Sequence, residues 1–550
     1  MFERCTGLIN VERGVLQGDP CSPLLFNLCF NSIMLTIKQP RYATLGYLWS
    51  TLSASIERSW MQFADDALVV ASNDKNAQIL LNVFVTWCKW ADMLIRIDKC
   101  STFGLRKENS VYGQYFPSIY IDNTQIPHIG LNQDFVYLGK YFNFNMNKDK
   151  AKADLLEKLK LLLSKITNLN VRPQLKLKIL KLAIYSKLRF DLKTYDFAHT
   201  WISNELDSVV CYHIRKWLEL PISSCVSHIC RLPLNKGGLN IPSLVEVASM
   251  QRLTTRYTMK NSANSDIQKL WLETSSQNIT TDEHLLENQN LNISKRGLTV
   301  KFENSSLKHV ETLTIQGTLI TEINKALPAS QITKWSKAIQ LLTATLFQFS
   351  RKALQQQLPT SANLLRWGKV TTAMCSLCQK PQTNKHVLNN CSSQAALERY
   401  KIRHDAVLLI ICNWLKQFIV PPATLHADIC SGELKPVEDV FDRLRPDIAV
   451  VSPGKIQVLE LTICHESNFD HSKKFKTSKY VNLKDERKIG YSSSKIELYT
   501  VEISSLGLMK DLSDFTTAVS KAKFSNEIYN NIIKSVISNS YNIYSNRNCR

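Results

Sequence analysis

The sequence predicts a multidomain α+β protein, and three features lead to this fold class. The chain has 550 residues, which is more than one hydrophobic core usually serves, so three or four domains are expected. Hydrophobic residues make up 44% of the chain, which excludes general disorder. Short runs of β-branched and aromatic residues beside turn residues alternate with Lys/Leu-rich segments at helical spacing, so strand-rich and helical regions should follow one another.

Charge and cysteine usage narrow the functional class. With 68 Lys+Arg and 47 Asp+Glu the formal net charge is +21, which favours a polyanionic partner over a merely solvated basic surface. No apolar run approaches the length of a transmembrane helix, and residues 1–4 do not begin a signal peptide, so we expect an intracellular protein without a membrane partner. The 15 cysteines are scattered, which suits thiols and a metal better than a disulfide framework.

The first motif spans residues 13–27 and is typical of a loop that leads into a helix. Gly18 would let the backbone approach a ligand closely, and Gln17 offers an amide to a base or sugar edge. Ser22 and Pro23 fit the start of a helix, which the following apolar residues continue. Taken alone, this stretch predicts a loop-to-helix junction and no particular chemistry.

The second motif is the Phe-Ala-Asp-Asp run of residues 63–66, flanked by apolar and β-branched residues. These flanks predict two short strands, and the adjacent Asp65 and Asp66 are expected in the tight turn between them. Two neighbouring carboxylates repel each other unless a cation is bound, so Mg²⁺ or Mn²⁺ is the expected occupant. A solvated Asp-Asp turn is the alternative for these residues alone.

Together, the two motifs closely resemble the palm of reverse transcriptases, specifically those of non-LTR retrotransposons. The resemblance implies that Gln17, Gly18 and Lys99 contact the nucleotide or the template. It also implies that Asp65 and Asp66 hold the catalytic Mg²⁺ ions. The chain is accordingly expected to be an RNA-directed DNA polymerase, a nucleotidyltransferase that uses an RNA template and deoxynucleoside triphosphates.

Residues 136–139, Val-Tyr-Leu-Gly, resemble the hairpin that grips the primer strand in this family. One departure concerns the third catalytic aspartate of these polymerases, which lies in a strand upstream of the glycine-rich loop. The thirteen residues before Gly14 contain no aspartate. We therefore expect a polymerase truncated at its N-terminus, which lacks the fingers and the first catalytic aspartate and polymerises poorly or not at all.

Residues 146–189 are rich in Lys and Leu, with twelve Lys+Arg against three Asp+Glu. The leucines recur at helical spacing, and Pro173 separates two expected helices. The excess of positive charge favours a thumb whose basic face follows a nucleic-acid backbone over an amphipathic pair with solvated lysines. Residues 232–244 resemble the element that ends the thumb in this family, whereas residues 261–310 have weak periodicity and predict a connector.

A C-x2-C-x7-H-x4-C pattern follows, formed by Cys375, Cys378, His386 and Cys391. Three thiolates and one imidazole complete a tetrahedral zinc shell, and the two-residue gap suits a knuckle. Accidental core cysteines are the alternative in a chain with 15 cysteines. A closed shell leaves no open coordination position, so the expected role is structural or in holding nucleic acid.

A second acidic pair is expected in the last third of the chain. Two β-rich runs joined by a Pro-Gly turn predict a hairpin that brings Asp447 near Glu460, and convergent carboxylates imply a second Mg²⁺ site. A common turn and a solvated lysine run are the alternatives. The whole pattern resembles the restriction-like endonuclease of the same retrotransposon class, which implies a catalytic lysine from the next helix, with Lys479 as the first choice and Lys476 as the second. Glu466 is a further helper candidate.

The combined motifs resemble the polyprotein of site-specific, rDNA-inserting non-LTR retrotransposons. The resemblance implies target-primed reverse transcription, in which the nuclease nicks target DNA and the polymerase extends the released 3′ hydroxyl along element RNA, in the nucleus at the site of integration. The alternatives are a relic, a domesticated nucleic-acid-binding protein, or a stand-alone endonuclease. The expected domains are a partial right-hand polymerase palm (1–145), an α-helical thumb with a helical extension (146–260), a helical linker region (261–365), a zinc knuckle (366–405), an α/β restriction-endonuclease-like domain (406–525) and a C-terminal tail (526–550).

Overall fold

The computed structural model describes residues 14–16, 18–50, 55–131, 133–277, 283–287, 290–429, 434–510, 512–520 and 525–549. The chain divides into two compact units. The first unit is made of Met1–Glu157, Asp191–Phe197 and Gln251–Ser294, and the second is made of Lys158–Phe190, Ala198–Met250 and Lys295–Arg550. Among the residues so described, no helix is both long and apolar enough to cross a bilayer.

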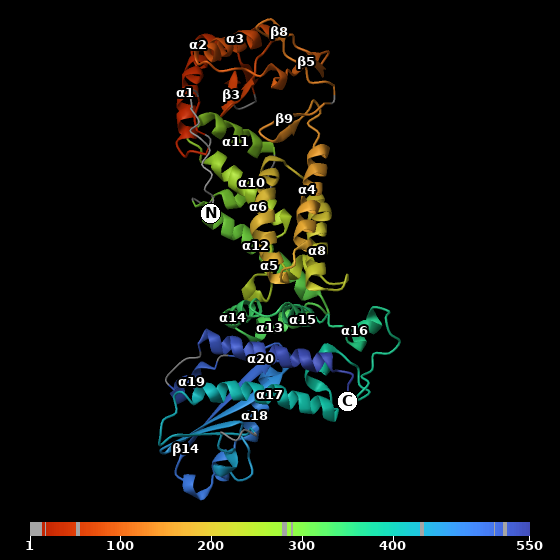
Figure 1. The fold of residues 1–550 in the computed structure, drawn as a ribbon, viewed down its shortest axis with the longest axis vertical. Helices are drawn as coiled ribbons and strands as arrows, with labels where there is room; N and C mark the ends of the chain where they lie inside the picture. Colours follow the sequence, from red (N-terminus) through yellow and green to blue (C-terminus); the bar gives the residue numbers. More distant parts are fainter. Residues whose placement is uncertain are drawn as a thin grey trace, which may run out of the picture. The chain divides into compact units, whose positions relative to one another are not determined.

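The N-terminal part of the first unit combines helices with two-stranded antiparallel hairpins (Figure 1). Its elements are α1 (Ser22–Ile37), α2 (Pro40–Ala43), β1 (Tyr47–Ser50), β2 (Ser55–Arg58), β3 (Trp60–Phe63), β4 (Asp66–Val69), α3 (Asp74–Trp90), β5 (Gly104–Glu108), β6 (Val111–Tyr115), β7 (Tyr120–Ile121), β8 (Thr124–Gln125), β9 (Phe135–Tyr137) and β10 (Lys140–Phe142). The predicted helix start is confirmed, because α1 begins at Ser22 and the Ser22 hydroxyl donates to the Leu16 carbonyl at 2.6 Å.

An aromatic core holds α1, α3 and β3 together. Phe30, Trp60, Leu80 and Trp87 are buried in it, and the rings of Phe30 and Trp87 lie 4.8 Å apart. Burying aromatic side chains of this size contributes several kcal/mol per domain, about 25 cal/mol for each Å² removed from water. The hairpin that carries Asp65 and Asp66 is therefore anchored at its base by Trp60.

The middle of the chain is helical. Its helices are α4 (Asp149–Asn168), α5 (Pro173–Ile179), α6 (Tyr185–Thr194), α7 (His199–Trp201), α8 (Ser208–Leu218), α9 (Val226–Ile229), α10 (Leu244–Lys260), α11 (Ser265–Gln277), α12 (Leu291–Thr312), α13 (Thr318–Ala326), α14 (Ala329–Ile339), α15 (Ala344–Leu354) and α16 (Ser361–Arg366). The predicted break at Pro173 is confirmed, since α5 begins at this residue. Part of the connector expected over 261–310 is also helical, because α11 and α12 fall within it.

The Gly-Gly-Leu element, residues 237–239 within the segment 232–244, is a largely buried turn in the second unit. Gly237 has φ +79°, and a Cβ on Gly238 would lie 1.7 Å from the Leu232 carbonyl oxygen, so neither position accepts a larger residue without strain. The fully buried Arg351 donates from its guanidinium to the Gly237 carbonyl at 2.9 Å. This buried donor fixes the turn against α15 of the same unit.

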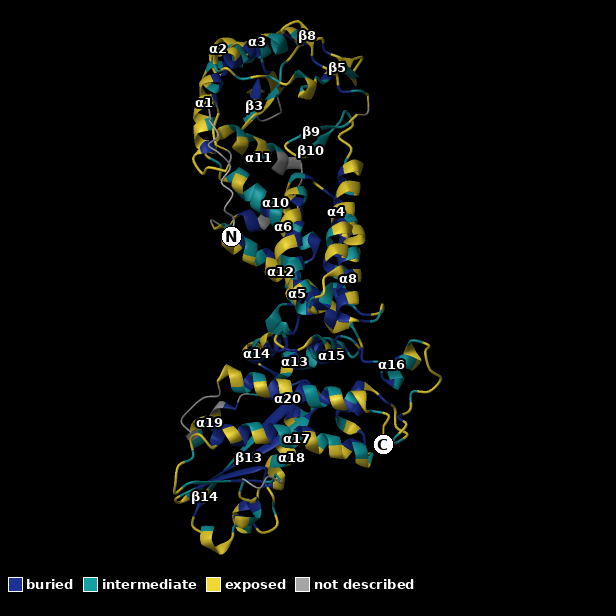
Figure 2. Cartoon of the chain, viewed as in Figure 1, coloured by how far each residue is buried: buried dark blue, intermediate teal, exposed yellow. Residues whose placement is uncertain are grey.

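The C-terminal part is an α/β layer built on a four-stranded sheet of order β11-β12-β13-β14. Strands β11, β12 and β13 are antiparallel neighbours, and β14 runs parallel to β13. Figure 2 shows that β13 is buried along most of its length. The elements are α17 (Gln394–Leu415), β11 (Thr424–Ala427), β12 (Ile448–Ser452), β13 (Lys455–Cys464), α18 (Phe469–Lys479), β14 (Lys495–Ser504), α19 (Ser513–Ser520) and α20 (Asn526–Ser545).

Most of the segment expected as a tail, 526–550, instead belongs to the long helix α20 (Asn526–Ser545). Tyr529, Ile532, Val536 and Ile543 are buried on one face of it, and α20 packs beside α17 (Figure 1). The fully buried Arg403 of α17 joins the two helices through a hydrogen bond to the Ser540 hydroxyl at 3.0 Å. The expected boundary at 405/406 also falls inside α17, so the knuckle and the sheet share one continuous helix.

Candidate polymerase, nuclease and metal sites

The Phe-Ala-Asp-Asp hairpin is present, with one correction to the expected turn. Strands β3 and β4 are antiparallel, and Phe63 pairs with Asp66. This register leaves Ala64 and Asp65 as the two turn residues, so Asp66 begins the second strand and does not share the turn with Asp65. Ala64 takes up the positive φ, +49°, that such a turn requires. Both carboxylates are exposed at the hairpin tip.

Two hydrogen bonds of the Gln62 side chain, one accepted and one donated, stiffen this turn. The Trp60 indole N–H donates to the Gln62 side-chain oxygen at 2.9 Å, and the Gln62 amide donates to the Ala64 carbonyl at 2.5 Å. Because Trp60 belongs to the buried core, the hairpin tip is tied to the body of the first unit. The aspartates are thus presented to solvent on a fixed base.

The predicted primer-grip hairpin is present, and one of its tyrosines senses the charge of Asp66. It is formed by β9 and β10, with Leu138 and Gly139 at positive φ in the turn. Burial raises the pKa of Tyr137, and the negative charge of Asp66 raises it further, which places the phenol within electrostatic reach of that carboxylate. Tyr137 of the primer-grip hairpin is therefore within range of the charge on Asp66.

Gly18 and Lys99, two other residues expected to bind nucleotide or template, form no hydrogen bond or ion pair with the aspartate hairpin in the described part of the chain. Gly18 has φ +96° in the turn before α1, a backbone conformation that favours glycine. Lys99 is exposed, and no ion pair among the described residues links it to Asp65 or Asp66. Gln17 lies outside the described residues.

Asp447 and Glu460 are brought together in the second unit by the predicted hairpin, which is confirmed as β12 and β13. Ile448 pairs with Leu459, so the two acids stand at the adjoining positions, and Gly454 provides the positive φ of the turn. The Asp447 N–H donates to Glu460 Oε2 at 3.2 Å, and the Leu461 N–H donates to Asp447 Oδ2 at 2.6 Å. Asp447 is 8% exposed and Glu460 is 1% exposed.

A cation on α18 compensates this buried acidic pair. Lys476 Nζ donates to Glu460 Oε1, so the lysine named as second choice is the one in contact with the carboxylates. Lys479, the first choice, instead donates to the Tyr480 hydroxyl at 3.0 Å and lies 4.6 Å from the centre of that ring. Burial raises the pKa of Glu460, the charge of Asp447 raises it further, and Lys476 opposes both.

His404 of α17 is a member of this site that sequence reasoning did not place there. Its Nε2 lies 3.4 Å from Asp447 Oδ2 and 3.3 Å from the Leu461 carbonyl, while Nδ1 lies 3.2 Å from Asp405. Burial lowers the pKa of His404, but the hydrogen bonds with Asp405 and Asp447 outweigh it and raise the pKa to about 10. Glu466, the further helper candidate, is buried beside His465.

The four predicted zinc ligands converge in the second unit. Their ligand atoms all lie within 4.8 Å of one another. Cys375 Sγ is 4.0 Å from Cys391 Sγ, Cys378 Sγ is 3.7 Å from Cys391 Sγ, and Cys378 Sγ is 3.3 Å from His386 Nε2. A tetrahedral zinc with ordinary bond lengths has S···S edges of about 3.8 Å and N···S edges of about 3.6 Å. The donor set therefore fits zinc.

The surroundings of the cluster hold its ligands in place. The Cys375 N–H donates to the Lys380 carbonyl at 2.8 Å, which closes the knuckle turn. The Tyr400 hydroxyl of α17 accepts from the Cys391 N–H at 3.1 Å and donates toward the Val387 carbonyl at 2.9 Å. Burial lowers the pKa of His386, and Lys380 adds to the effect, so the imidazole is kept in the neutral form that a metal ligand needs.

Comparison with known proteins agrees with the polymerase motifs. Residues 2–141 match the family described as reverse transcriptase (RNA-dependent DNA polymerase). The chain is 25% identical over 475 residues to the retrovirus-related Pol polyprotein from type-2 retrotransposable element R2DM of Drosophila melanogaster, covering 84% of the chain and 41% of that protein. It is 22% identical over 508 residues to the Pol polyprotein from type-1 retrotransposable element R2 of Nasonia vitripennis, covering 89% of the chain and 43% of that protein.

The chain therefore spans less than half the length of these curated relatives. The family match falls on the part of the first unit that contains the aspartate hairpin and the primer-grip hairpin. The long matches cover more than four fifths of the chain and therefore extend well beyond residues 2–141, into the second unit. Residues 2–141 are thus similar to the reverse transcriptase family, and the chain is similar to the Pol polyproteins of R2 retrotransposable elements.

Proposed function

We propose that the chain belongs to a retrotransposon polyprotein in which a metal-dependent nuclease nicks target DNA and the reverse transcriptase extends the new end along element RNA. The observation that carries the nuclease half is the buried pair of Asp447 and Glu460 with Lys476 in contact. Natural proteins rarely bury two carboxylates side by side, because each raises the cost of ionising the other. Such a cluster is typical of a site that binds a cation and does chemistry.

The chemistry is hydrolysis of one phosphodiester bond. Water adds to the phosphorus, the bond between phosphorus and the 3′ oxygen breaks, and a 5′ phosphate and a 3′ hydroxyl remain. Asp447 and Glu460 would hold Mg²⁺, which when bound supplies Lewis-acid activation of the phosphate and of water. Lys476 would neutralise developing negative charge on the phosphate, and His404 would keep Asp447 in one orientation through its 3.4 Å contact.

The polymerase half would use Asp65 and Asp66 as ligands for Mg²⁺ or Mn²⁺. Their exposure at a stiff hairpin tip leaves their oxygens free for a metal and a triphosphate, and the primer-grip hairpin that carries Tyr137 would hold the primer strand. The partners would be the template RNA, target DNA and deoxynucleoside triphosphates, and the setting would be the nucleus. Coupling nicking and extension in one protein would spare the DNA end a diffusive search.

The cysteine cluster would bind one structural Zn²⁺ through Cys375, Cys378, His386 and Cys391. Four protein ligands leave no place for a substrate, so the ion would stabilise the knuckle and would not hydrolyse anything. We expect Cys378→Ser to lower the zinc content of the purified protein from one ion per chain to less than about 0.2. Metal analysis measures this, with Cys412→Ser, a buried cysteine outside the cluster, as the matched control. A parent protein without zinc contradicts the assignment.

Asp447→Ala tests the nuclease. We expect Mg²⁺-dependent nicking of a supercoiled plasmid to fall at least 100-fold, because one of two metal-binding carboxylates is lost, while DNA affinity measured by fluorescence anisotropy changes less than about threefold. Asp485→Ala, which removes an exposed acid of the same unit, should leave both quantities unchanged. Undiminished nicking by Asp447→Ala would sink the nuclease assignment.

A further inference from the structure

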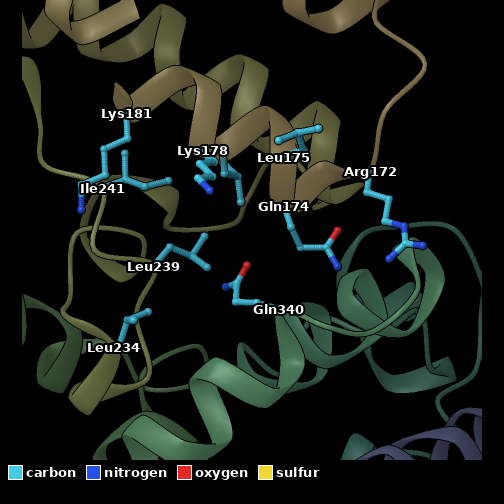
Figure 3. Close-up of a pocket in the computed structure, with 10 residues that line it drawn as sticks. Arg172, Gln174, Leu175, Lys178, Lys181, Leu234, Leu239, Ile241 and Gln340 are labelled. Atoms are coloured by element: carbon cyan, nitrogen blue, oxygen red, sulfur yellow. The ribbon is translucent and has the colours of Figure 1, made fainter. Parts of the chain in front are cut away.

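A cavity of about 470 Å³ lies in the second unit, and neither the polymerase nor the nuclease site uses it. Its walls come from α5 and the π-helix Leu180–Ile184 that follows it, from the Gly-Gly-Leu element and its neighbours, and from the end of α14 (Figure 3). The volume falls in the range of small-ligand pockets and is much too small for a duplex. The lining residues are Arg172, Gln174, Leu175, Leu177, Lys178, Lys181, Leu234, Leu239, Ile241 and Gln340.

The charge of this cavity is entirely positive. Arg172, Lys178 and Lys181 line it and no acidic residue does. Within the described parts of the chain, none of these three cations forms an ion pair. Burial lowers the pKa of Lys181, since the ammonium is half-withdrawn from water without a carboxylate to compensate it. An anion in the cavity would supply the missing partner.

The floor of the cavity combines apolar side chains with two amides. Leu239 and Ile241 provide flat aliphatic contact, and Figure 3 shows the amides of Gln174 and Gln340 turned to the same hollow. Gln174 donates to the Leu342 carbonyl at 2.9 Å, yet its own Oε1 is buried and accepts no hydrogen bond from any described residue. A ligand N–H that reached this oxygen would give it the hydrogen bond that it lacks.

We propose that this cavity holds one unstacked nucleotide of a single-stranded nucleic acid. Its base would pack on Leu239 and Ile241, and its flanking phosphates would contact Lys178 and Lys181. A base has apolar faces and a polar edge, which match the aliphatic floor and the two amides. The phosphodiester chain matches Lys178, Lys181 and Arg172. A duplex is excluded because its bases are stacked inside the helix, where the cavity cannot reach them. The inference does not depend on the nuclease or the polymerase assignment.

The test compares two double variants of the full chain that remove equal charge. Lys178→Gln/Lys181→Gln empties the cavity of two cations, whereas Lys160→Gln/Lys165→Gln removes two exposed lysines that do not line it. Fluorescence anisotropy with labelled dT12, rU12 and a 12-base-pair duplex, without added divalent cations, gives the affinities. We expect the cavity variant to lose about tenfold in the ratio of single-strand to duplex affinity, and its salt slope on single strands to fall by about 1.4. The matched variant should keep the parent ratio.

Two further measurements keep the proposal open to refutation. Gln340→Leu should weaken single-strand binding about threefold with an unchanged salt slope, because an edge contact is lost and no charge is. An oligonucleotide with a central 2-aminopurine should gain fluorescence on binding, as its base leaves the stack. If the cavity variant loses the same affinity for dT12 and for rU12, the cavity accepts both DNA and RNA. A larger loss for one oligonucleotide identifies the strand type that the cavity prefers. Equal ratios in the two double variants, an unchanged 2-aminopurine signal, or stronger competition by free mononucleotide than by dT12 would overturn the proposal.

Discussion

The two acidic pairs of this chain differ in how the protein holds them. Asp65 and Asp66 are exposed at a hairpin tip, whereas Asp447 and Glu460 are almost entirely buried. The buried pair comes with its own compensation, a lysine from α18, a histidine from α17 and two backbone N–H donors. The exposed pair has a stiff base and leaves its oxygens in water. The charges of the buried pair are therefore balanced by the protein itself, whereas the charges of the exposed pair are left to be balanced by bound metal and substrate.

The largest expected effect separates the two pairs by function. In a preparation that extends primers, Asp65→Asn should lower primer extension about 1,000-fold, because a metal-binding charge is lost, and should leave plasmid nicking unchanged. Asp447→Ala should do the reverse. Glu57→Gln, an exposed acid of the neighbouring hairpin, is the matched control and should change neither rate. If Asp65→Asn extends primers at the parent rate, the hairpin is not the polymerase metal site.

The next effect concerns the cation that compensates the buried pair. Lys476→Met should lower nicking about 100-fold, since Lys476 alone of the two candidate lysines contacts Glu460, while Lys479→Met should lower it less than about threefold. Both variants remove one charge from the same helix, so each is the control of the other. Rates of supercoiled-plasmid relaxation under single-turnover conditions give the comparison. A larger loss in Lys479→Met would reverse the assignment.

The smallest effect is on stability and comes from a third buried acid. Burial raises the pKa of Glu466 to about 7, above its usual 4.5. The folded protein therefore binds more protons than the unfolded one between these values, and the free energy of unfolding should fall by about 2–3 kcal/mol as pH rises from 4.5 to 7. Glu466→Gln should remove this decrease in urea unfolding experiments, and exposed Asp66→Asn should keep it. An unchanged pH profile in Glu466→Gln contradicts the expectation.

Local features of both sites could be predicted from the sequence. Each acidic pair lies in a hairpin whose turn residues and β-branched flanks are adjacent in the chain, and the metal ligands follow a regular spacing. The prediction that Asp65 and Asp66 share the first turn was wrong. The pairing of Phe63 with Asp66 leaves only two turn residues, Ala64 and Asp65. Composition favours Asp in turns, but strand register decides which residue sits there.

Features that depend on tertiary packing could not be predicted. The contact of His404 with Asp447 joins a helix to a strand with a different element between them, and no spacing rule reports it. Lys476 and Lys479 lie one turn apart on α18, so the sequence could not tell which of them faces Glu460. The approach of Tyr137 to Asp66 and the packing of α20 on α17 are likewise consequences of the folded chain.

Helix α17 contacts both the cysteine cluster and the acidic pair of Asp447 and Glu460. Tyr400 holds the backbone of the cysteine cluster, and His404, one turn further along the same helix, contacts the Asp447 carboxylate. A rigid helix transmits displacement with little loss over one turn. On the proposed assignments, zinc bound at the cysteine cluster would fix the position of a histidine about 6 Å further along the helix axis, and DNA nicking would depend on a metal that does not contact DNA.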